Sequence, residues 1–307
     1  MEIHRNMKVA VLLGGMSAER PVSLDSGAAV ASALQRRGWN AHEVDVGPDL
    51  PARLLAGGFE VAWLALHGRF GEDGCVQGLL EIMRIPYTGS SPTASAVAMD
   101  KLLTKRVLEG HGLALPAQVV LGPDEPVPVG IELPVVAKTP TGGSTLGISF
   151  CRTVDELERG VADCRAYGGT VQLESFVQGT EITVALLDGV PLPVVAIRPD
   201  GGFFDYEAKY TKGRTRYIVP ADIDPEPAAR AQRDAAVAAK VLGLSGVCRA
   251  DFIVDDAGVP WFLEVNTIPG MTETSLSPMA AAEAGLSFED LVERVLLGAR
   301  LHLERVE

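Results

Sequence analysis

The chain has 307 residues, 47% of them hydrophobic and 22% charged, which is the composition of a globular protein rather than of an intrinsically disordered one. Its formal net charge of -13 disfavours nucleic acid and anionic membrane surfaces as partners, because both repel an acidic protein. A chain of this length is expected to form about two or three domains.

The first third of the sequence alternates strands with a helix, which is typical of a small parallel α/β domain. An apolar run over 8–13 ends at two glycines and predicts a buried strand that leads into a turn. A helix is expected over 22–37, because Pro21 precedes it and Gly38 follows it. Further strands are expected over 41–46 and 59–66.

The rest of the chain has an α+β pattern. Ser91 and Pro92 have the residue types of a helix N-cap and a first helical position, and a helix is expected to run through 99–109. Strands are expected over 133–138, 148–151, 170–174, twice within 181–196, and over 248–254 and 260–265, with helices over 153–164, 225–242 and 288–301. The segment 198–220 is polar and basic without a clear period, and an ordered loop of that length is usually functional, for example a lid.

The most informative pattern is the predicted hairpin over 248–266, whose turn is expected near 255–258. Since side chains alternate faces along a strand, one face is expected to be core and to carry Ala250, Phe252, Val254, Trp261, Leu263 and Val265. The other face carries Arg249, Asp251, Glu264 and Asn266. Two carboxylates and an amide oxygen suit Mg²⁺, which proteins hold with one or two carboxylates plus substrate phosphates. The alternative is a solvated hairpin face, which does not explain why Arg249 lies among the acids.

A glycine-rich loop over 138–147 follows the strand that ends at Lys138. Glycines allow backbone N–H groups to approach phosphate oxygens. The loop is not a P-loop, because the lysine precedes the glycines and no Gly-Lys-Ser/Thr sequence follows. Taken alone, it is also compatible with a flexible hairpin loop.

Three further segments are candidates for binding. Glu19 follows the glycine turn after the first strand, where a substrate ammonium could bind, although an acid there also interacts favourably with a helix N-terminus. His67 lies at the carboxyl end of a strand and opens the glycine-rich turn 67–74. In the basic loop, Tyr210 lies within a cluster of positive charge formed by Lys209, Lys212, Arg214 and Arg216, which suits a lid over phosphates, or a solvated surface loop.

The four cysteines, Cys75, Cys151, Cys164 and Cys248, have no spacing typical of a zinc or redox site, so reduced and mostly buried thiols are expected. The polar segment 1–7 lacks the apolar stretch of a secretory signal, and no apolar run approaches the roughly 20 residues of a membrane span. These features together predict a cytoplasmic protein.

Five segments together resemble the D-alanine–D-alanine ligases, a family of the ATP-grasp superfamily. They are 14–20, 67–74, 99–101, 206–210 and 263–272, and they occur in the order of the family. The resemblance extends along nearly the whole chain, and five motifs in family order are far more specific than any one of them.

The resemblance implies an α/β and α+β fold of three domains that grip ATP between the second and the third. An N-terminal parallel α/β substrate domain would occupy 1–91, a central ATP-grasp domain 92–180, and a C-terminal ATP-grasp domain with the lid loop and the magnesium site 181–307. The family's members are usually homodimers.

The resemblance also implies a role for each matching residue. Lys101 and Lys138 would contact ATP phosphates, and the nucleoside would be held by Glu174, Phe176, Val177 and Glu181. Two Mg²⁺ ions, or Mn²⁺, would be bound by Asp251, Glu264 and Asn266. Glu19 and His67 would lie beside the first D-alanine, while the second would be bordered by Lys209, Ser275 and Leu276. Arg249 and the Gly270 N–H would bind an oxyanion, and Ser144 and Tyr210 would link the lid to the substrate.

The implied reaction joins two D-alanines through an acyl phosphate for peptidoglycan precursor synthesis. The main competing interpretation is a D-alanine–D-lactate ligase, which Tyr210 disfavours because those relatives typically carry histidine there. An ATP-grasp ligase for a different carboxylate and amine, and a non-catalytic nucleotide-binding module, are more distant possibilities. The sequence departs from the family at Thr139, which separates Lys138 from Pro140, and at Ser175-Phe176-Val177, where an aromatic-Leu pair is frequent.

Overall fold

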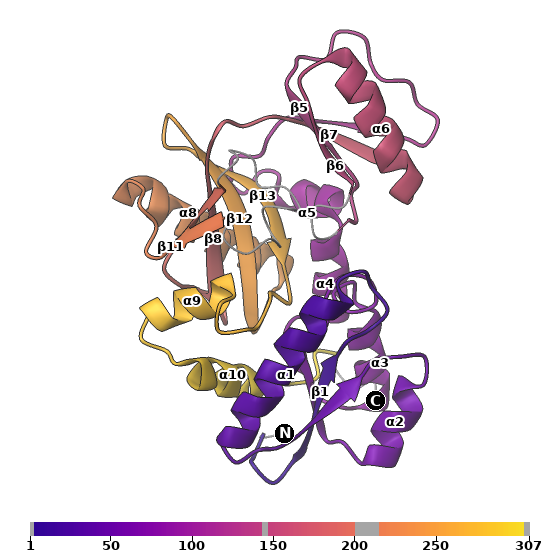
Figure 1. Ribbon diagram of the computed structural model, residues 1–307, viewed down its shortest axis with the longest axis vertical. Coiled ribbons are helices and arrows are strands. Elements are labelled where there is room, and N and C mark those ends of the chain that lie inside the picture. The colour runs from indigo at the N-terminus through magenta and orange to yellow at the C-terminus, as the bar shows by residue number, and fades with distance from the viewer. Residues whose placement is uncertain (1–2, 143–146, 200–214, 304–307) are drawn as a thin grey trace.

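A computed structural model describes residues 3–142, 147–199 and 215–303, which form three β-sheets with flanking helices (Figure 1). Ser144, Lys209 and Tyr210 lie outside the described residues. Within the described part of the chain, no helix is both long and apolar enough to cross a membrane.

The N-terminal sheet is parallel, as predicted, with the strand order β2-β1-β3. Its strands are β1 (Lys8–Leu13), β2 (Asn40–Asp45) and β3 (Val61–Leu64), and its helices are α1 (Arg20–Arg36), α2 (Leu50–Gly57) and α3 (Cys75–Met83). The strand and helix predictions are confirmed to within a few residues, but α2 and α3 were not predicted. Pro21 occupies the first turn of α1, where its missing N–H costs nothing.

A four-stranded antiparallel sheet has the order β4-β7-β5-β6. It consists of β4 (Gln118–Leu121), β5 (Val135–Lys138), β6 (Ile148–Cys151) and β7 (Val171–Ser175), and α6 (Val154–Gly168) packs on it. Thr153 begins α6 with a capping box, in which its side chain and that of Glu156 satisfy each other's backbone N–H groups.

The largest sheet is antiparallel, with the main order β11-β10-β8-β12-β13 and β9 paired with β8. Its strands are β8 (Gly179–Leu187), β9 (Val190–Pro191), β10 (Val195–Pro199), β11 (Thr215–Ile218), β12 (Val247–Asp255) and β13 (Pro260–Asn266). The alanine-rich helix α8 (Pro225–Leu242) covers one face, and the prediction for it is confirmed at both ends.

The prediction of a single helix through 99–109 is wrong. The chain forms two helices there, α4 (Pro92–Met99) and α5 (Lys101–Leu108). Asp100 interrupts them with an extended backbone, and its carboxylate accepts hydrogen bonds from the N–H groups of Leu102 and Leu103 at 2.9 and 3.0 Å. Asp100 is therefore the N-cap of α5. The N-cap predicted at Ser91 is confirmed, since its hydroxyl accepts from Ala94 N–H.

The chain ends in α9 (Leu276–Glu283) and α10 (Phe288–Leu297), which return to the N-terminal part of the molecule (Figure 1). Helix α10 begins as predicted but ends four residues earlier, and α9 was not predicted. One hydrophobic core joins residues of β1, β3 and α1 to residues of β8, α9 and α10. Arg36 of α1 and Arg37, the C-cap that follows it, also form ion pairs with Glu289 and Asp290 of α10. The first and last parts of the sequence are thus packed against each other.

Three of the cysteines are buried, and all four are free thiols. Cys75 is exposed, so the expectation of buried thiols holds for Cys151, Cys164 and Cys248 only.

Helix α1 approaches β1 so closely that only glycine fits at Gly27. A Cβ atom there would lie 2.3 Å from Leu13 Cβ. Gly27→Ala is expected to lower the free energy of unfolding by about 1–3 kcal/mol, because the core cannot take the added methyl group without moving backbone. Gly78→Ala in α3 is the matched control: a Cβ there meets nothing within 4 Å, so this change should be neutral or stabilising. Denaturant unfolding of both variants measures the difference, and equal midpoints would contradict this account of the α1–β1 contact.

Candidate active site

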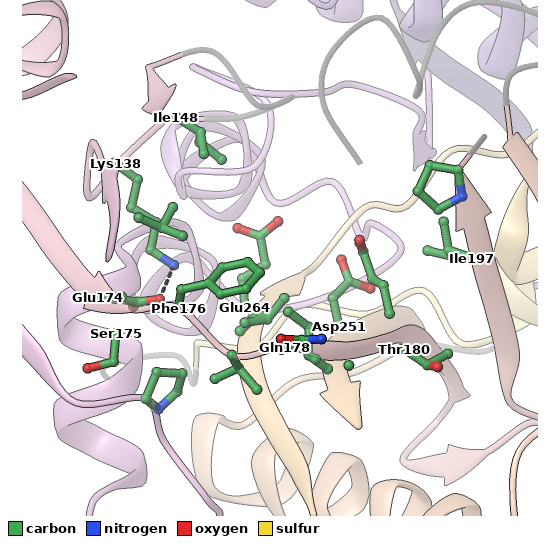
Figure 2. A pocket seen from close by; sticks show the side chains of 18 of the residues that line it. Lys138, Ile148, Glu174, Ser175, Phe176, Gln178, Thr180, Ile197, Asp251 and Glu264 are labelled. Atoms are coloured by element: carbon green, nitrogen blue, oxygen red, sulfur yellow. Dashed lines mark ion pairs between the residues drawn. The ribbon is translucent and has the colours of Figure 1, made fainter. Parts of the chain in front are cut away.

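A cavity of about 600 Å³ is lined by residues of both antiparallel sheets (Figure 2). Its wall contains ten of the residues singled out in the sequence: Lys101, Lys138, Glu174, Phe176, Val177, Glu181, Arg249, Asp251, Glu264 and Leu276. Glu19, His67, Asn266, Gly270 and Ser275 are not part of this wall.

One part of the cavity is apolar. Val136, Ile148, Phe176, Ile253 and Leu263 line it. The Phe176 ring is tilted against the Phe150 ring with centroids 4.5 Å apart, and this contact fixes its position. A wall of this kind suits a flat, weakly polar group such as a nucleobase.

The polar part of the cavity gathers cations within an acidic protein. Lys101, Lys138, Arg198, Arg216 and Arg249 all line it. Lys101 Nζ donates to the Gly142 carbonyl at 2.6 Å and lies 3.0 Å from Glu264 Oε2. Such a cluster is suited to a polyanion, since phosphate oxygens accept hydrogen bonds from lysine and arginine.

Glu174 lies where the apolar and cationic parts meet. Its Oε2 accepts from Lys138 Nζ at 2.6 Å, and its Oε1 forms an ion pair with Lys105 of α5 (Figure 2 shows the Lys138 pair). Burial alone would raise the pKa of Glu174, but the charges of Lys138 and Lys105 hold it below its ordinary value. The residue predicted to bind adenine is therefore ionised and already paired with two lysines.

The hairpin β12–β13 places the predicted polar residues on one face, as expected. Arg249 lies opposite Asn266 and Asp251 opposite Glu264 in the register of the two strands. Residues directly opposite each other share a face, so the prediction for this face is confirmed.

The prediction for the core face of the hairpin is partly wrong. A β-bulge after Asp251 leaves Leu263 without a residue opposite it in β12, so that Phe262 faces the core, whereas Leu263 and Trp261, both predicted to be core, do not. Phe262 is fully buried with its ring against Phe252, while Leu263 lines the cavity. The turn between the two strands spans 256–259, and the bulge changes the register so that Asp251 still lies opposite Glu264.

Arg249 and Asp251 form a bidentate ion pair. Arg249 Nε and Nη2 donate to the two carboxylate oxygens of Asp251, each at 2.8 Å, and Thr183 Oγ1 donates to Asp251 Oδ1 at 2.5 Å. The Arg249–Asp251 part of the polar face is therefore not solvated, since the two side chains are only 11% and 10% exposed. Burial lowers and Asp251 raises the pKa of Arg249, with a net rise, so its guanidinium stays charged.

The donors of this face fit a hard cation only in part. Within the described residues, no group of three or more His, Cys, Asp and Glu side chains is placed to hold a metal ion. Asp251, Glu264 and the amide of Asn266 supply oxygen donors alone, and Glu264 is 38% exposed beside the cationic part of the cavity. This set matches Mg²⁺ if phosphate oxygens of a nucleotide complete the coordination.

A second group of polar side chains lies at the carboxyl ends of β1 and β3. His67 is buried, and its Nε2 lies 3.4 Å from Ser26 Oγ. Glu19 and Glu72 flank Gly68: a Cβ on Gly68 would lie 2.6 Å from Glu19 Oε2, and Gly68 N–H donates to Glu72 Oε2 at 2.6 Å. The structure thus brings Glu19 and His67 together, as their positions after adjacent parallel strands predict.

The loop after β13 joins this group to the hairpin. Ser26 Oγ, next to His67, accepts from Met271 N–H at 3.1 Å. Gly270 lies against Ser275, whose hydroxyl accepts from Thr272 N–H at 3.1 Å. The residues predicted to bind the oxyanion and the second substrate are therefore neighbours in one loop.

Three buried polar residues of this region were not predicted. Thr183 orients Asp251, Lys105 pairs with Glu174, and Glu72 is 8% exposed. Lys105 could have been found from its position four residues after Lys101, which places both lysines on one face of a helix. Glu72 lies inside the segment 67–74, but no local pattern distinguishes it from the neighbouring Asp73.

Burial, and next the charge of Glu19, raise the pKa of Glu72 to about 8, although the N–H groups of Gly68 and Ile268 and the charge of Arg249 oppose the rise. Between pH 4.5 and about 8 the folded protein holds a proton on Glu72 that the unfolded chain releases, so the stability linked to Glu72 is lost as pH rises through this window.

Glu72→Gln is therefore expected to become more stable than the wild type by a margin that grows from pH 4.5 to about 8. Denaturant unfolding as a function of pH measures this margin, with Glu43→Gln, a change of an exposed glutamate, as the control. A margin that is constant with pH would contradict the proton on Glu72.

Residues 125–297 match the family described as D-ala D-ala ligase C-terminus, and residues 42–90 match D-ala D-ala ligase N-terminus. The D-alanine–D-alanine ligase of Syntrophotalea carbinolica is 49% identical over 296 residues, which are 96% of this chain and 96% of that protein. The crystal structure of D-alanine–D-alanine ligase from Bacillus anthracis superposes with a TM-score of 0.84 at 34% identity, covering 94% of this chain and 96% of that one. The same Bacillus anthracis protein complexed with ATP gives a TM-score of 0.83 at 31% identity, with the same shares of the two chains covered. Because the identity is this high along nearly the whole chain, and because the structure superposes on solved ligases over 94% of its length, the chain belongs to the D-alanine–D-alanine ligase family, with its ATP-grasp fold.

Proposed function

We propose that this protein is an ADP-forming ligase that uses ATP to join two D-alanines, and that it supplies the dipeptide for peptidoglycan precursor synthesis. Family membership supports the activity. The main structural observation that supports the ligase activity is that Arg249, Asp251 and Glu264 line the same cavity as Lys101 and Lys138. A non-catalytic nucleotide-binding module has no need for a buried arginine between the phosphate region and the Glu19–His67 group.

In the first chemical step, a carboxylate oxygen of one D-alanine attacks the γ-phosphorus of ATP, and ADP leaves. Lys101 and Lys138 neutralise the charge that develops on the phosphate oxygens. Glu19 would pair with the ammonium of this D-alanine, with His67 beside it. The product of the step is an acyl phosphate.

In the second step, the neutral amine of the other D-alanine attacks the acyl carbon, and phosphate leaves after a tetrahedral oxyanion has formed. Arg249 is permanently charged and buried, so it stabilises this oxyanion more than a solvated group would. The Gly270 N–H would be the second donor, and Ser275, Leu276 and Lys209 would border the incoming D-alanine.

Two Mg²⁺ ions, with Mn²⁺ as a substitute, would be held by Asp251, Glu264 and Asn266 together with phosphate oxygens. Mg²⁺ held by these residues would supply positive charge that neutralises the phosphate oxygens. All three of these ligands have other partners in the described structure: Asp251 pairs with Arg249, Glu264 pairs with Lys101, and Asn266 Oδ1 accepts from Ile268 N–H at 2.9 Å.

The remaining assignments follow the same proposal. The nucleoside would be held by Glu174, Phe176, Val177 and Glu181, and the lid would act through Ser144 and Tyr210. We also propose a cytoplasmic homodimer with domains at 1–91, 92–180 and 181–307. Two of the three sheets fall within one of these ranges each, whereas the largest sheet begins at Gly179, two residues before the third range, and Ala98 and Leu108 of the second range pack in its core.

The proposal is tested by the release of ADP from Mg²⁺-ATP with and without D-alanine, together with product analysis. D-Alanine is expected to stimulate ADP release and to yield D-alanyl-D-alanine. A panel of other D-amino acids and D-lactate tests the competing substrates. ADP release that does not respond to D-alanine, or that yields a depsipeptide in preference, would overturn the assignment.

Arg249→Lys tests the oxyanion role. Lysine keeps the charge but loses the planar fork that holds both oxygens of Asp251. We expect kcat to fall by a factor on the order of 10² or more, as for the loss of an oxyanion donor, with little change in ATP affinity. Steady-state kinetics separates the two effects. A weaker ATP affinity with unchanged kcat would instead make Arg249 a phosphate contact.

Glu264→Gln tests the metal site. The change removes an anionic ligand from a partly exposed side chain, whereas Asp251→Asn would also leave Arg249 buried without its counter-charge. Turnover at any Mg²⁺ concentration is expected to collapse while thermal unfolding stays close to wild type. Asp256→Asn, an exposed acid in the turn of the same hairpin, is the control and should be fully active. Normal turnover of Glu264→Gln at saturating Mg²⁺ would rule out the ligand role.

A further inference from the structure

Lys105 is a fully buried lysine that the proposed reaction does not use. It lies in α5 one turn after Lys101, with 0% of its side chain exposed, and its Nζ forms an ion pair with Glu174 Oε1. Lys101 and Lys138 line the cavity, but Lys105 does not. It can therefore act on a bound ligand only through Glu174.

The two oxygens of Glu174 face different partners. Oε1 accepts from Lys105 and from Gln172 Nε2, both buried, whereas Oε2 accepts from Lys138 at 2.6 Å. Gln172 is itself held by Gln118, to whose Oε1 it donates at 2.6 Å. One side of the carboxylate is thus fixed by the protein interior, and the other side is paired with a lysine of the cavity wall.

These contacts imply different fates for the two lysines when a nucleotide enters. A triphosphate carries more negative charge than one carboxylate, so it competes with Glu174 for Lys138. If Lys138 were its only partner, Glu174 would be left as an isolated buried carboxylate, which is costly and favours protonation. Lys105 remains in place and keeps the charge of Glu174 balanced.

We propose that Lys105 is a positioning residue that keeps Glu174 ionised and aimed at the purine 6-position while Lys138 moves from Glu174 to the phosphates. The proposal rests on the proposed binding of ATP in this cavity and deepens it. An ionised carboxylate accepts a hydrogen bond from the 6-amino group of adenine and repels the 6-oxo group of hypoxanthine. Lys105 therefore sets the preference for ATP over inosine triphosphate.

The electrostatics of the pair agree with this exchange. Burial, and then the charge of Lys138, lower the pKa of Lys105 to about 7, while Glu174 opposes the shift. When Lys138 moves to the phosphates, its charge no longer lowers the pKa of Lys105 as much. The charged form of Lys105 is therefore favoured at the step in which Glu174 loses its other partner.

The test compares ATP with inosine triphosphate in the wild type, Lys105→Met and Lys105→Arg. The ratio of kcat/KM values, ATP over inosine triphosphate, is expected to fall by a factor on the order of 10 in Lys105→Met, as for the loss of a hydrogen bond to a charged group. Lys105→Arg, which keeps the charge, should retain most of the ratio. Leu108→Ala is the matched control: it removes a fully buried side chain from the same helix without touching Glu174, so it should lower stability and leave the ratio unchanged.

A double-mutant cycle with Glu174→Gln shows whether Lys105 acts through Glu174. Glu174→Gln should lose the discrimination by itself, and adding Lys105→Met should change the ratio no further. This comparison also decides the matter if Lys105→Met alone does not fold, because the double variant removes both charges of the buried Lys105–Glu174 pair and leaves only Lys138, which lines the cavity, without Glu174. A wild-type ratio in Lys105→Met, or an equal further fall in the Glu174→Gln background, would overturn the proposal.

Equilibrium binding of the two Mg²⁺-nucleotides, measured by calorimetry, separates this proposal from the proposed function. If the wild type binds ATP but shows no turnover that depends on D-alanine, the ligase assignment fails and the binding ratio still tests Lys105. If turnover is normal and the ratio does not respond to Lys105→Met, only the role of Lys105 fails.

Discussion

The site depends on one buried ion pair in the middle of the largest sheet. Arg249 and Asp251 are adjacent on the same face of β12, and each is too buried to remain charged without the other. Because β12 is hydrogen-bonded to β8 on one side and to β13 on the other, the pair cannot shift along the sheet. The same pairing places Thr183 beside Asp251 and Glu264 opposite it. The proposed oxyanion donor Arg249 and the proposed metal ligands Asp251 and Glu264 are thereby held in place by strand pairing.

A second constraint is the packing between the ends of the chain. The core that joins α1 and β1 to α9 and α10 holds the Glu19–His67 group against the loop that follows β13. The hydrogen bond from Met271 N–H to Ser26, and the contacts of Ser90 with Ser245, are local signs of this junction. Without it, the proposed first substrate subsite and Arg249 would lie on separate units with no fixed distance between them.

The cavity collects positively charged side chains although the protein as a whole is acidic. In a chain of net charge -13, the cavity is lined by lysines and arginines, and its buried cations are each paired with a carboxylate. Lys101 is paired with Glu264 and Lys138 with Glu174. The two lysines that would bind phosphate oxygens are thus paired with carboxylates of the protein. These pairs neutralise the charge of the lysines before a nucleotide binds.

The sequence determined what depends on local periodicity. Alternation along 248–266 was enough to place Arg249, Asp251, Glu264 and Asn266 on one face, and the alanine-rich period with its Pro225 start defined α8. Motif order was enough to identify the family and to name ten of the residues that line the cavity. These signals are carried by the side-chain pattern of a single element, which needs no knowledge of its neighbours.

Tertiary structure decided what depends on contacts between distant segments. The bulge at Leu263 was invisible to alternation, because a single inserted residue changes the face of its neighbours without changing the composition. The break at Asp100 lay within a run that reads as one helix, until the carboxylate caps α5. The pairing of Lys105 with Glu174 joins residues 69 positions apart, and the raised pKa of Glu72 requires Glu19 and burial supplied by other strands. Burial and charge pairing are properties of the packed chain, so the local pattern that names a residue cannot reveal its partner.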